Sequence, residues 1–333
     1  MNVATNTKTA APVPAIMSSS VDEGYPTRMA PFGHKLVELA RHRPEIVGMS
    51  ADLAKYTDIH IFAQAYPDRF YQMGMSEQLM ATAAGGLAKE GFIPFATTYA
   101  TFAARRCYDF ISQGVAEQDA NVKFVGGLPG LTTGYGPSHQ ATDDLAIFRA
   151  MPNLTVIDPC DAVDVEQMTE AVADHKGPVY MRILRGAVPV VLDEYNYRFQ
   201  IGKAALLRGG RDVLVISTGF MTMRALDAAK DLQKDSVDVA VLHVPTLKPL
   251  DEVAIIREAQ RPGRLVVVAE NHSEIGGLGE AVAGCLMRAG VHPAGFRQIA
   301  LPDAFLDAGS LPVLQDRYGI SRRVMGDSIR RWL

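Results

Sequence analysis

The sequence predicts an α/β protein of two domains, each a mostly parallel sheet with helices on both faces. Short apolar runs such as 213–216 and 265–269 alternate with longer segments of helical spacing, such as 77–84 and 278–289. Strands that alternate with helices form parallel sheets that are covered on both faces. The chain has 333 residues, 48% of them hydrophobic, so it can bury two cores.

The alternation divides the chain into two units. In the first unit, helical spacing at 36–40 leads to expected strands at 45–49, 92–98, 122–126, 155–158 and 179–183, and expected helices at 77–84, 102–114, 142–149 and 163–173. In the second unit, the expected strands are 213–217, 237–243 and 264–270, and the expected helices are 222–234, 251–260 and 278–289. These elements predict a disordered tail at 1–25, domains at 26–190 and 203–333, and a linker at 191–202.

Composition argues against several classes of partner. The formal net charge is -4, and Lys and Arg are spread along the chain, so we expect neither nucleic acid nor an anionic membrane as a ligand. No apolar run approaches the roughly 20 residues of a membrane span. The N-terminal tail is rich in Ala, Thr, Ser and Pro and lacks the apolar segment of a secretory signal, which predicts a cytoplasmic protein. The cysteines Cys107, Cys160 and Cys285 lack metal-site spacing and are expected to be reduced core residues.

Two features of the first domain could carry chemistry. Glu77, in GMSEQLM, starts a helix, where a surface carboxylate near the helix N-terminus is the simpler interpretation. Tyr99, Phe102 and Arg105 recur every three residues across a strand-to-helix junction. An aromatic stripe alone is typical of a core, but an arginine on that stripe needs an anionic partner if it is buried.

A third feature is the long loop 126–140, GGLPGLTTGYGPSHQ, which lies between a predicted strand and a predicted helix. Its five glycines and two prolines give it a fixed shape, and it ends at His139. Loops of this kind on α/β scaffolds carry function more often than their length alone suggests. The loop is neither a GxGxxG nor a P-loop motif, so nucleotide binding is a poor explanation.

In this order and spacing, the motifs resemble the pyrimidine-binding domain of transketolases and of the related 1-deoxy-xylulose-5-phosphate synthases. The resemblance rests on GMSEQLM, the aromatic run before Arg105, the loop that closes in GPSHQ, PVYMRILRG at 178–186, and SADL at 50–53. ENHSEIGGLG at 270–279 is similar to a stretch of the transketolase C-terminal domain. The resemblance covers roughly residues 26–333.

The resemblance implies thiamine diphosphate as the cofactor. Its thiazolium carbon must lose a proton to the imino form of its own aminopyrimidine, and a carboxyl group that shares a proton with the pyrimidine ring in a water-poor cleft favours that form. Glu77 is expected to be that group, and Tyr99 and Phe102 the aromatic wall on which the pyrimidine rests. Asp52 and Arg105 are expected to line the same cofactor site.

The resemblance also implies a substrate site. His139 is expected to bond substrate oxygens near the reacting carbon and so to join Glu77 as a catalytic residue. Arg185 and Arg28 are expected to hold a sugar phosphate, because the guanidinium fork suits phosphate oxygens. Several positions leave the donor and acceptor open: Tyr56, Arg105, Gly127 and Tyr135 depart from transketolase, and Leu128 replaces a loop arginine of the synthases.

The diphosphate end of the cofactor needs a second domain. The family binds Mg²⁺ there through a GDG motif followed by an Asn, and no GDG occurs in this sequence. We therefore expect no metal ligands on this chain. A partner chain, an N-terminal transketolase-type subunit, is expected to supply them at a shared interface, and a pair of each chain would give an α2β2 tetramer.

Three functions remain open at this point. The first is a transketolase subunit that moves a two-carbon ketol unit between sugars or sugar phosphates. The second is a 1-deoxy-xylulose-5-phosphate synthase-like enzyme or the beta subunit of a 2-oxo acid dehydrogenase, which would act on pyruvate or a related oxo acid. The third is a non-catalytic binding or regulatory subunit, against which the combination of Glu77 with two aromatic residues argues.

Overall fold

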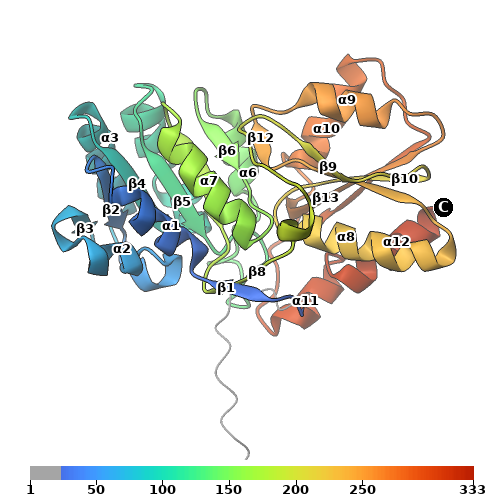
Figure 1. The fold of residues 1–333 in the computed structure, drawn as a ribbon, viewed down its shortest axis with the longest axis horizontal. Coiled ribbons are helices and arrows are strands. Elements are labelled where there is room, and N and C mark those ends of the chain that lie inside the picture. The colour runs from blue at the N-terminus through green and yellow to red at the C-terminus, as the bar shows by residue number, and fades with distance from the viewer. Residues whose placement is uncertain (1–23) are drawn as a thin grey trace, which may run out of the picture.

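The computed structural model describes residues 24–333 and has two lobes side by side, each built around its own sheet (Figure 1). The first sheet has seven strands in the order β12-β6-β7-β5-β4-β2-β3, and the second has five in the order β14-β13-β10-β11-β9. The predicted fold class is confirmed. The tail expected at 1–25 falls almost wholly on residues 1–23, which lie outside the described residues.

The first sheet is parallel except at one edge. Its strands are β2 (Ile46–Ser50), β3 (Phe70–Gln72), β4 (Ile93–Tyr99), β5 (Lys123–Gly127), β6 (Thr155–Ile157), β7 (Val179–Ile183) and β12 (Thr246–Lys248). Every residue of β2, β4, β5 and β7 is buried, as expected for strands covered on both faces. The edge strand β12 runs antiparallel to β6 and comes from the part of the chain assigned to the second domain, a crossing that the sequence did not predict.

Helices cover both faces of this sheet (Figure 1). They are α1 (Pro31–Ala40), α2 (His60–Ala65), α3 (Glu77–Lys89), α4 (Ala100–Arg106), α5 (Tyr108–Ile111), α6 (Asp144–Ala150) and α7 (Ala162–Asp174). The prediction of one continuous helix over 102–114 is wrong. The backbone leaves helical geometry at Cys107 (φ -115°, ψ 14°) and continues as α5 and a π-helical turn. The prediction failed because a periodic apolar pattern does not reveal a single non-helical residue.

The second lobe repeats the layered arrangement. Its strands are β9 (Ala205–Arg208), β10 (Val213–Ser217), β11 (Val239–His243), β13 (Leu265–Ser273) and β14 (Gly295–Leu301), with only β9 antiparallel to its neighbour. Its helices are α8 (Met221–Leu232), α9 (Glu252–Ala259), α10 (Leu278–Arg288), α11 (Leu311–Arg317) and α12 (Arg322–Trp332). A two-stranded ladder of β1 (Thr27–Met29) and β8 (Ala187–Pro189) lies at the base of the molecule.

A buried polar contact joins the lobes. His243 at the end of β11 lies with its Nε2 atom 2.8 Å from a carboxylate oxygen of Asp164 on α7, and both side chains are completely buried. The other ring nitrogen of His243 lies 2.8 Å from the hydroxyl of Thr222, so the polar atoms of the buried imidazole are satisfied.

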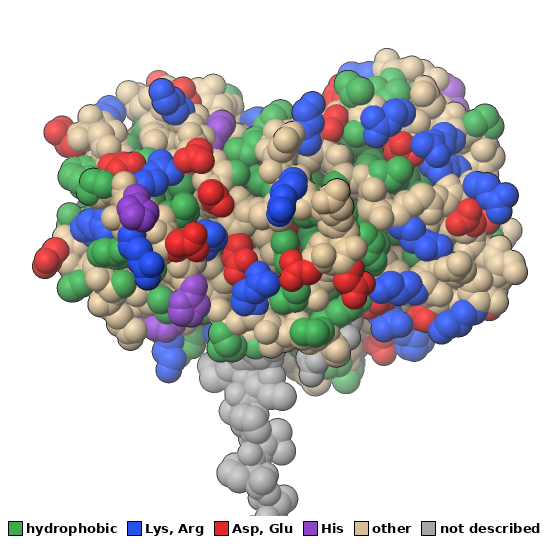
Figure 2. Space-filling view, viewed as in Figure 1, with side chains coloured by type: hydrophobic (Ala, Val, Ile, Leu, Met, Phe, Trp, Pro, Cys, Tyr) green, Lys and Arg blue, Asp and Glu red, His purple; other side chains and the backbone are tan. Residues whose placement is uncertain are grey.

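On the face seen in Figure 2, acidic and basic side chains are interspersed, and a hollow separates the tops of the lobes.

Candidate active site

The carboxyl ends of four neighbouring strands bring the predicted site residues to one edge of the first sheet. Asp52 follows β2, Tyr99 ends β4, the glycine-rich loop follows β5, and Arg185 follows β7. These strands are parallel to their neighbours, so their carboxyl ends share an edge. Open α/β sheets bind ligands outside the carboxyl ends of their strands, which makes this edge the candidate active site.

Glu77 is the first residue of α3 and lies inside the protein. Only 2% of its side chain is exposed, so the simpler interpretation of a surface carboxylate is wrong. The positive end of the helix dipole favours a carboxylate at this position. One carboxylate oxygen accepts a hydrogen bond of 2.8 Å from Nη1 of Arg106.

An aromatic cluster lies next to this carboxylate. The rings of Tyr99 and Phe102 are 5.6 Å apart at 38°, and the His139 ring meets both edge-on at 5.9 and 5.5 Å. The Tyr135 ring meets His139 from another side at 5.5 Å. The structure thus brings together the two aromatic residues and the histidine that the sequence singled out.

His139 is held as a neutral imidazole at neutral pH. Partial burial and then the positive charge of Arg106 lower its pKa below the ordinary histidine value. The Ser138 hydroxyl lies 2.9 Å from its Nδ1 atom. A neutral imidazole can donate one hydrogen bond and accept another, which suits contact with substrate hydroxyl and carbonyl oxygens.

The arginine that reaches the cluster is Arg106, which the sequence analysis missed. Its guanidinium carbon lies 3.8 Å from the centre of the Phe102 ring. Arg105 turns the other way, forms two hydrogen bonds to Asp143 at 2.9 and 3.0 Å, and donates to the Pro137 carbonyl at 3.2 Å. Arg105 therefore has an anionic partner, Asp143. Its bond to Pro137 fixes the glycine-rich loop, so Arg105 does not contact the aromatic cluster as Arg106 does. Spacing alone does not distinguish the two arginines, since residues i+3 and i+4 of a helix both share a face with residue i.

The two other predicted arginines differ in their surroundings. The guanidinium carbon of Arg185 lies 5.5 Å from the centre of the exposed Tyr56 ring, which itself meets Tyr99 edge-on at 6.4 Å. Arg185 therefore borders the aromatic cluster. Arg28, on β1, is engaged by two carboxylates, Glu166 at 2.5 Å and Asp193 at 3.4 Å.

Asp52 stands exposed just beyond β2, with a left-handed backbone (φ 60°). Its backbone N–H donates to the Gln72 side chain at 2.8 Å, so a contact from β3 fixes its backbone. Asp52 is therefore an exposed residue beside the candidate site.

The C-terminal lobe holds the glycine-rich loop in place. Asn271 accepts a hydrogen bond from the Leu131 N–H at 2.8 Å and donates one to the Pro129 carbonyl at 3.0 Å. The Gln315 side chain donates to the Leu131 carbonyl at 3.1 Å. Gly130 has a positive φ of 56°, and a Cβ atom there would collide with the Asn271 backbone oxygen, so both conformation and space require glycine.

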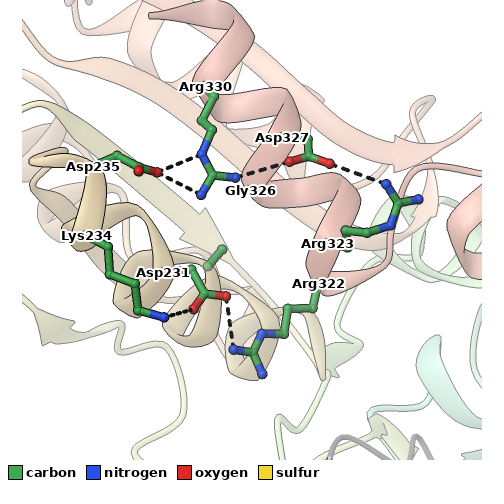
Figure 3. A pocket seen from close by; sticks show the side chains of 9 residues that line it. Asp231, Lys234, Asp235, Arg322, Arg323, Gly326, Asp327 and Arg330 are labelled. Carbon is green, nitrogen blue, oxygen red and sulfur yellow. Dashed lines mark hydrogen bonds and ion pairs between the residues drawn. The ribbon is translucent and has the colours of Figure 1, made fainter.

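A separate cavity of about 310 Å³ lies between α8 and α12, outside the candidate active site (Figure 3). Its charged side chains pair with one another: Arg330 contacts Asp235 and Asp327, while Asp231 accepts from Lys234 and Arg322. Paired surface charges of this kind link the two helices but contribute little to stability, and none of these paired groups is free to react. We therefore assign this cavity a structural role.

Two classes of site have no basis in the described part of the chain. Among residues 24–333, no group of three or more His, Cys, Asp or Glu side chains is placed to hold a metal ion. Within the same range, no helix is long and apolar enough to cross a bilayer. The three cysteines are buried and form no disulfide, as predicted.

Comparisons with known proteins agree with this architecture. The family models of the transketolase pyrimidine-binding domain and the transketolase C-terminal domain match residues 25–190 and 202–325. A Sinorhizobium fredii protein described as a member of the transketolase family is 63% identical over 96% of this chain and 92% of its own length. A subunit of a 6-deoxy-6-sulfo-D-fructose transketolase from a Clostridium species is 39% identical over 86% of this chain and 88% of its own length.

Two further relatives bear on the arrangement of the chain. A split-gene transketolase, solved as an inactive beta4 tetramer, has a TM-score of 0.82 and 37% identity, covering 91% of this chain and 98% of its own. The 1-deoxy-D-xylulose-5-phosphate synthase of Heliobacterium modesticaldum is 36% identical over 90% of this chain, which spans only 46% of that synthase. On these matches, the chain belongs to the transketolase family and carries its pyrimidine-binding and C-terminal domains.

Proposed function

We propose that this chain is one subunit of a thiamine diphosphate-dependent transketolase that transfers a two-carbon ketol unit between sugars or sugar phosphates. The observation that carries the proposal is the buried carboxylate of Glu77, linked through Arg106 to the wall formed by Tyr99 and Phe102. A buried acid beside two aromatic rings, at the ligand-binding edge of an α/β sheet, suits a flat nitrogen heterocycle.

The described residues fit the pyrimidine end of the cofactor. When bound, thiamine diphosphate supplies a carbon that becomes nucleophilic on losing a proton and can carry the ketol unit. Glu77 would share a proton with the pyrimidine ring nitrogen, and the Tyr99 and Phe102 rings would hold that ring in place. The neutral His139 imidazole would bond substrate oxygens, and Arg185 at the border of the site would attract an anionic sugar.

The diphosphate and Mg²⁺ would be held by a partner chain. Residues 24–333 contain no cluster of metal ligands, and relatives of this chain are described as a transketolase subunit and a split-gene transketolase. The proposed assembly is two copies of each chain, with each cofactor at an interface between unlike subunits.

The proposal is tested by reconstitution. The chain is mixed with a candidate partner bearing a GDG motif, thiamine diphosphate and Mg²⁺, and supplied with xylulose 5-phosphate, fructose 6-phosphate or 6-deoxy-6-sulfofructose as donor. We expect transfer of two carbons to an aldose acceptor. Mass spectrometry of the products measures this transfer. Failure of every donor, with a complex that binds the cofactor, would remove the transketolase assignment.

A second candidate is a synthase-type reaction on pyruvate. The similarity to 1-deoxy-D-xylulose-5-phosphate synthases, at 36% identity over most of this chain, favours it. The same reconstituted complex would then release CO₂ from pyruvate in the presence of an aldose phosphate. Measuring CO₂ release and ketol transfer on one preparation distinguishes the two reactions.

A further inference from the structure

Arg106 makes both of the contacts that the proposed function reserves for the pyrimidine ring. Its Nη1 atom donates to the Glu77 carboxylate at 2.8 Å, and its guanidinium lies 3.8 Å from the centre of the Phe102 ring. The guanidinium is flat and carries N–H donors at its edge, as an aminopyrimidine does. It can therefore satisfy the same acid and stack on the same aromatic residue as the heterocycle would.

Arg106 and a bound heterocycle would compete for the same two partners. A separation of 3.8 Å is van der Waals contact, so no other ring can stack on the face of Phe102 that the guanidinium covers. The Arg106 N–H already occupies one oxygen of the Glu77 carboxylate, so a heterocycle nitrogen would compete with Arg106 for this acid. The Arg106 side chain is 44% exposed, so it can rotate into solvent without disturbing the core.

We propose that Arg106 is a gate residue that occupies the pyrimidine position while the cofactor is absent and swings out when the cofactor binds. This inference rests on the proposed function. The closed position protects a buried carboxylate that would otherwise lack a partner, which stabilises the chain before it meets cofactor and partner subunit. The gate moves alone, because the neighbouring Arg105 is anchored to Asp143 and Pro137.

The gate makes a quantitative prediction about cofactor affinity. A protein whose binding-competent state is only partly populated binds with an affinity reduced by that fraction. The ion pair is open to solvent on the Arg106 side, and together with the cation–π contact it favours the closed state modestly, so removing the guanidinium should tighten thiamine diphosphate binding about three- to tenfold. The same change should lower the thermal unfolding midpoint of the chain without cofactor.

The test compares Arg106→Met with the unchanged protein and with Arg288→Met. Methionine keeps the apolar stem of Arg106, and the control removes an exposed ion pair with Glu252 in the other lobe. Calorimetry with the Mg²⁺-loaded two-chain complex gives the Kd of thiamine diphosphate, and thermal unfolding of the single chain gives the midpoint. Arg106→Gln serves if the methionine variant does not fold.

The inference predicts tighter cofactor binding and a lower midpoint for the Arg106 variant, with an unchanged Kd for the control. Equal or weaker cofactor binding by Arg106→Met and Arg106→Gln would overturn the gate, because Arg106 would then be a passive neighbour or a cofactor contact. If the unchanged complex binds no thiamine diphosphate, the proposed function fails and the gate fails with it. If the unchanged complex binds and only the predicted gain is missing, the gate alone fails.

Discussion

The side-chain oxygen of Asn271 accepts a hydrogen bond of 2.8 Å from the backbone N–H of Leu131, so the C-terminal lobe binds the glycine-rich loop of the first lobe. The other end of the same amide donates to Pro129. Asn271 is 2% exposed, and these bonds are therefore made away from water. The loop that presents His139 takes its shape partly from a domain that contributes none of the predicted catalytic residues.

Replacing Asn271 with Ala is expected to lower kcat/KM of the reconstituted enzyme while the fold persists. The change leaves the buried Leu131 N–H unsatisfied, at a cost of about 1–3 kcal/mol if the loop stays in place, and the Pro129 carbonyl keeps only the hydrogen bond from the Thr132 hydroxyl. Loop movement relieves that cost and displaces His139. Steady-state kinetics together with urea unfolding separate loss of activity from loss of stability. The exposed Asn196→Ala change is the control, and equal kinetics for both variants would contradict the coupling.

Replacing Glu77 with Gln is expected to reduce ketol transfer at least about 100-fold, the lower range for loss of an acid–base group. Glutamine has nearly the same shape and can still accept a hydrogen bond from Arg106, but it cannot share a proton with a heterocycle nitrogen. Transfer is assayed with the reconstituted pair, and Glu90→Gln, an exposed glutamate at the end of α3, is the control. Unchanged activity of Glu77→Gln would support a non-catalytic subunit.

The interior of the fold could be predicted from sequence because its pattern is local. The strands at 179–183 and 213–217 were predicted to the residue, since each is a short and almost wholly apolar run between polar or turn-forming neighbours. The three-residue strands Thr27–Met29, Ala187–Pro189 and Thr246–Lys248 were missed. Each exists only because a distant segment lies beside it, and three residues are too few to show a period.

The residue types of the site could be predicted from sequence, but the directions in which their side chains point could not. Glu77, Tyr99, Phe102 and His139 come together because parallel strands end at one edge, which follows from the alternation of strands and helices. Which of two adjacent arginines faces Phe102 depends on the exact start of α4, and helix boundaries are the least certain part of a sequence prediction. The partners of Arg28 lie far along the chain, so no local pattern reveals them.

The buried ion cluster under the site predicts a large loss of stability for Asp144→Ala. Asp144 accepts from Arg182 at 2.5 and 2.9 Å and from the Tyr180 hydroxyl at 2.6 Å. Burial alone would raise the pKa of Asp144, but Arg182 outweighs it and holds the pKa below its ordinary value, so the carboxylate is charged. Its removal leaves the buried Arg182 with Asp158, 3.2 Å away, as its remaining carboxylate and with the Asn271 carbonyl, and we expect a loss of about 3–5 kcal/mol in the free energy of unfolding.

Chemical denaturation measures the free energy of unfolding of Asp144→Ala, of the control Glu252→Ala and of the unchanged protein. Glu252 pairs with Arg288 at 2.6 Å, but both side chains are about half exposed or more, so that variant should lie within about 1 kcal/mol of the unchanged protein. Similar losses for the two variants would show that burial does not decide the contribution of these charge pairs.

A buried lysine at the amino end of β5, away from the candidate site, predicts a pH dependence of stability. The ammonium group of Lys123 donates to Asn121, to the His175 carbonyl and to the Gly177 carbonyl at 2.7–2.8 Å, and its side chain is fully buried. Burial, and secondarily the charge of Arg43, lower the pKa of Lys123 to about 7, whereas the unfolded chain keeps the ordinary value near 10.5. Between these values the unfolded chain binds more protons, so the contribution of Lys123 to stability rises with pH.

Lys123→Met removes this titration. The free energy of unfolding of the unchanged protein, minus that of the variant, should therefore grow as the pH rises from about 7 to about 9.5. Urea unfolding at several pH values measures the difference, and other titrating groups cancel because both proteins share them. The exposed Lys230→Met change should give parallel profiles. A difference that stays flat for Lys123→Met would mean that its ammonium group keeps its proton across this range, held by the three oxygens around it.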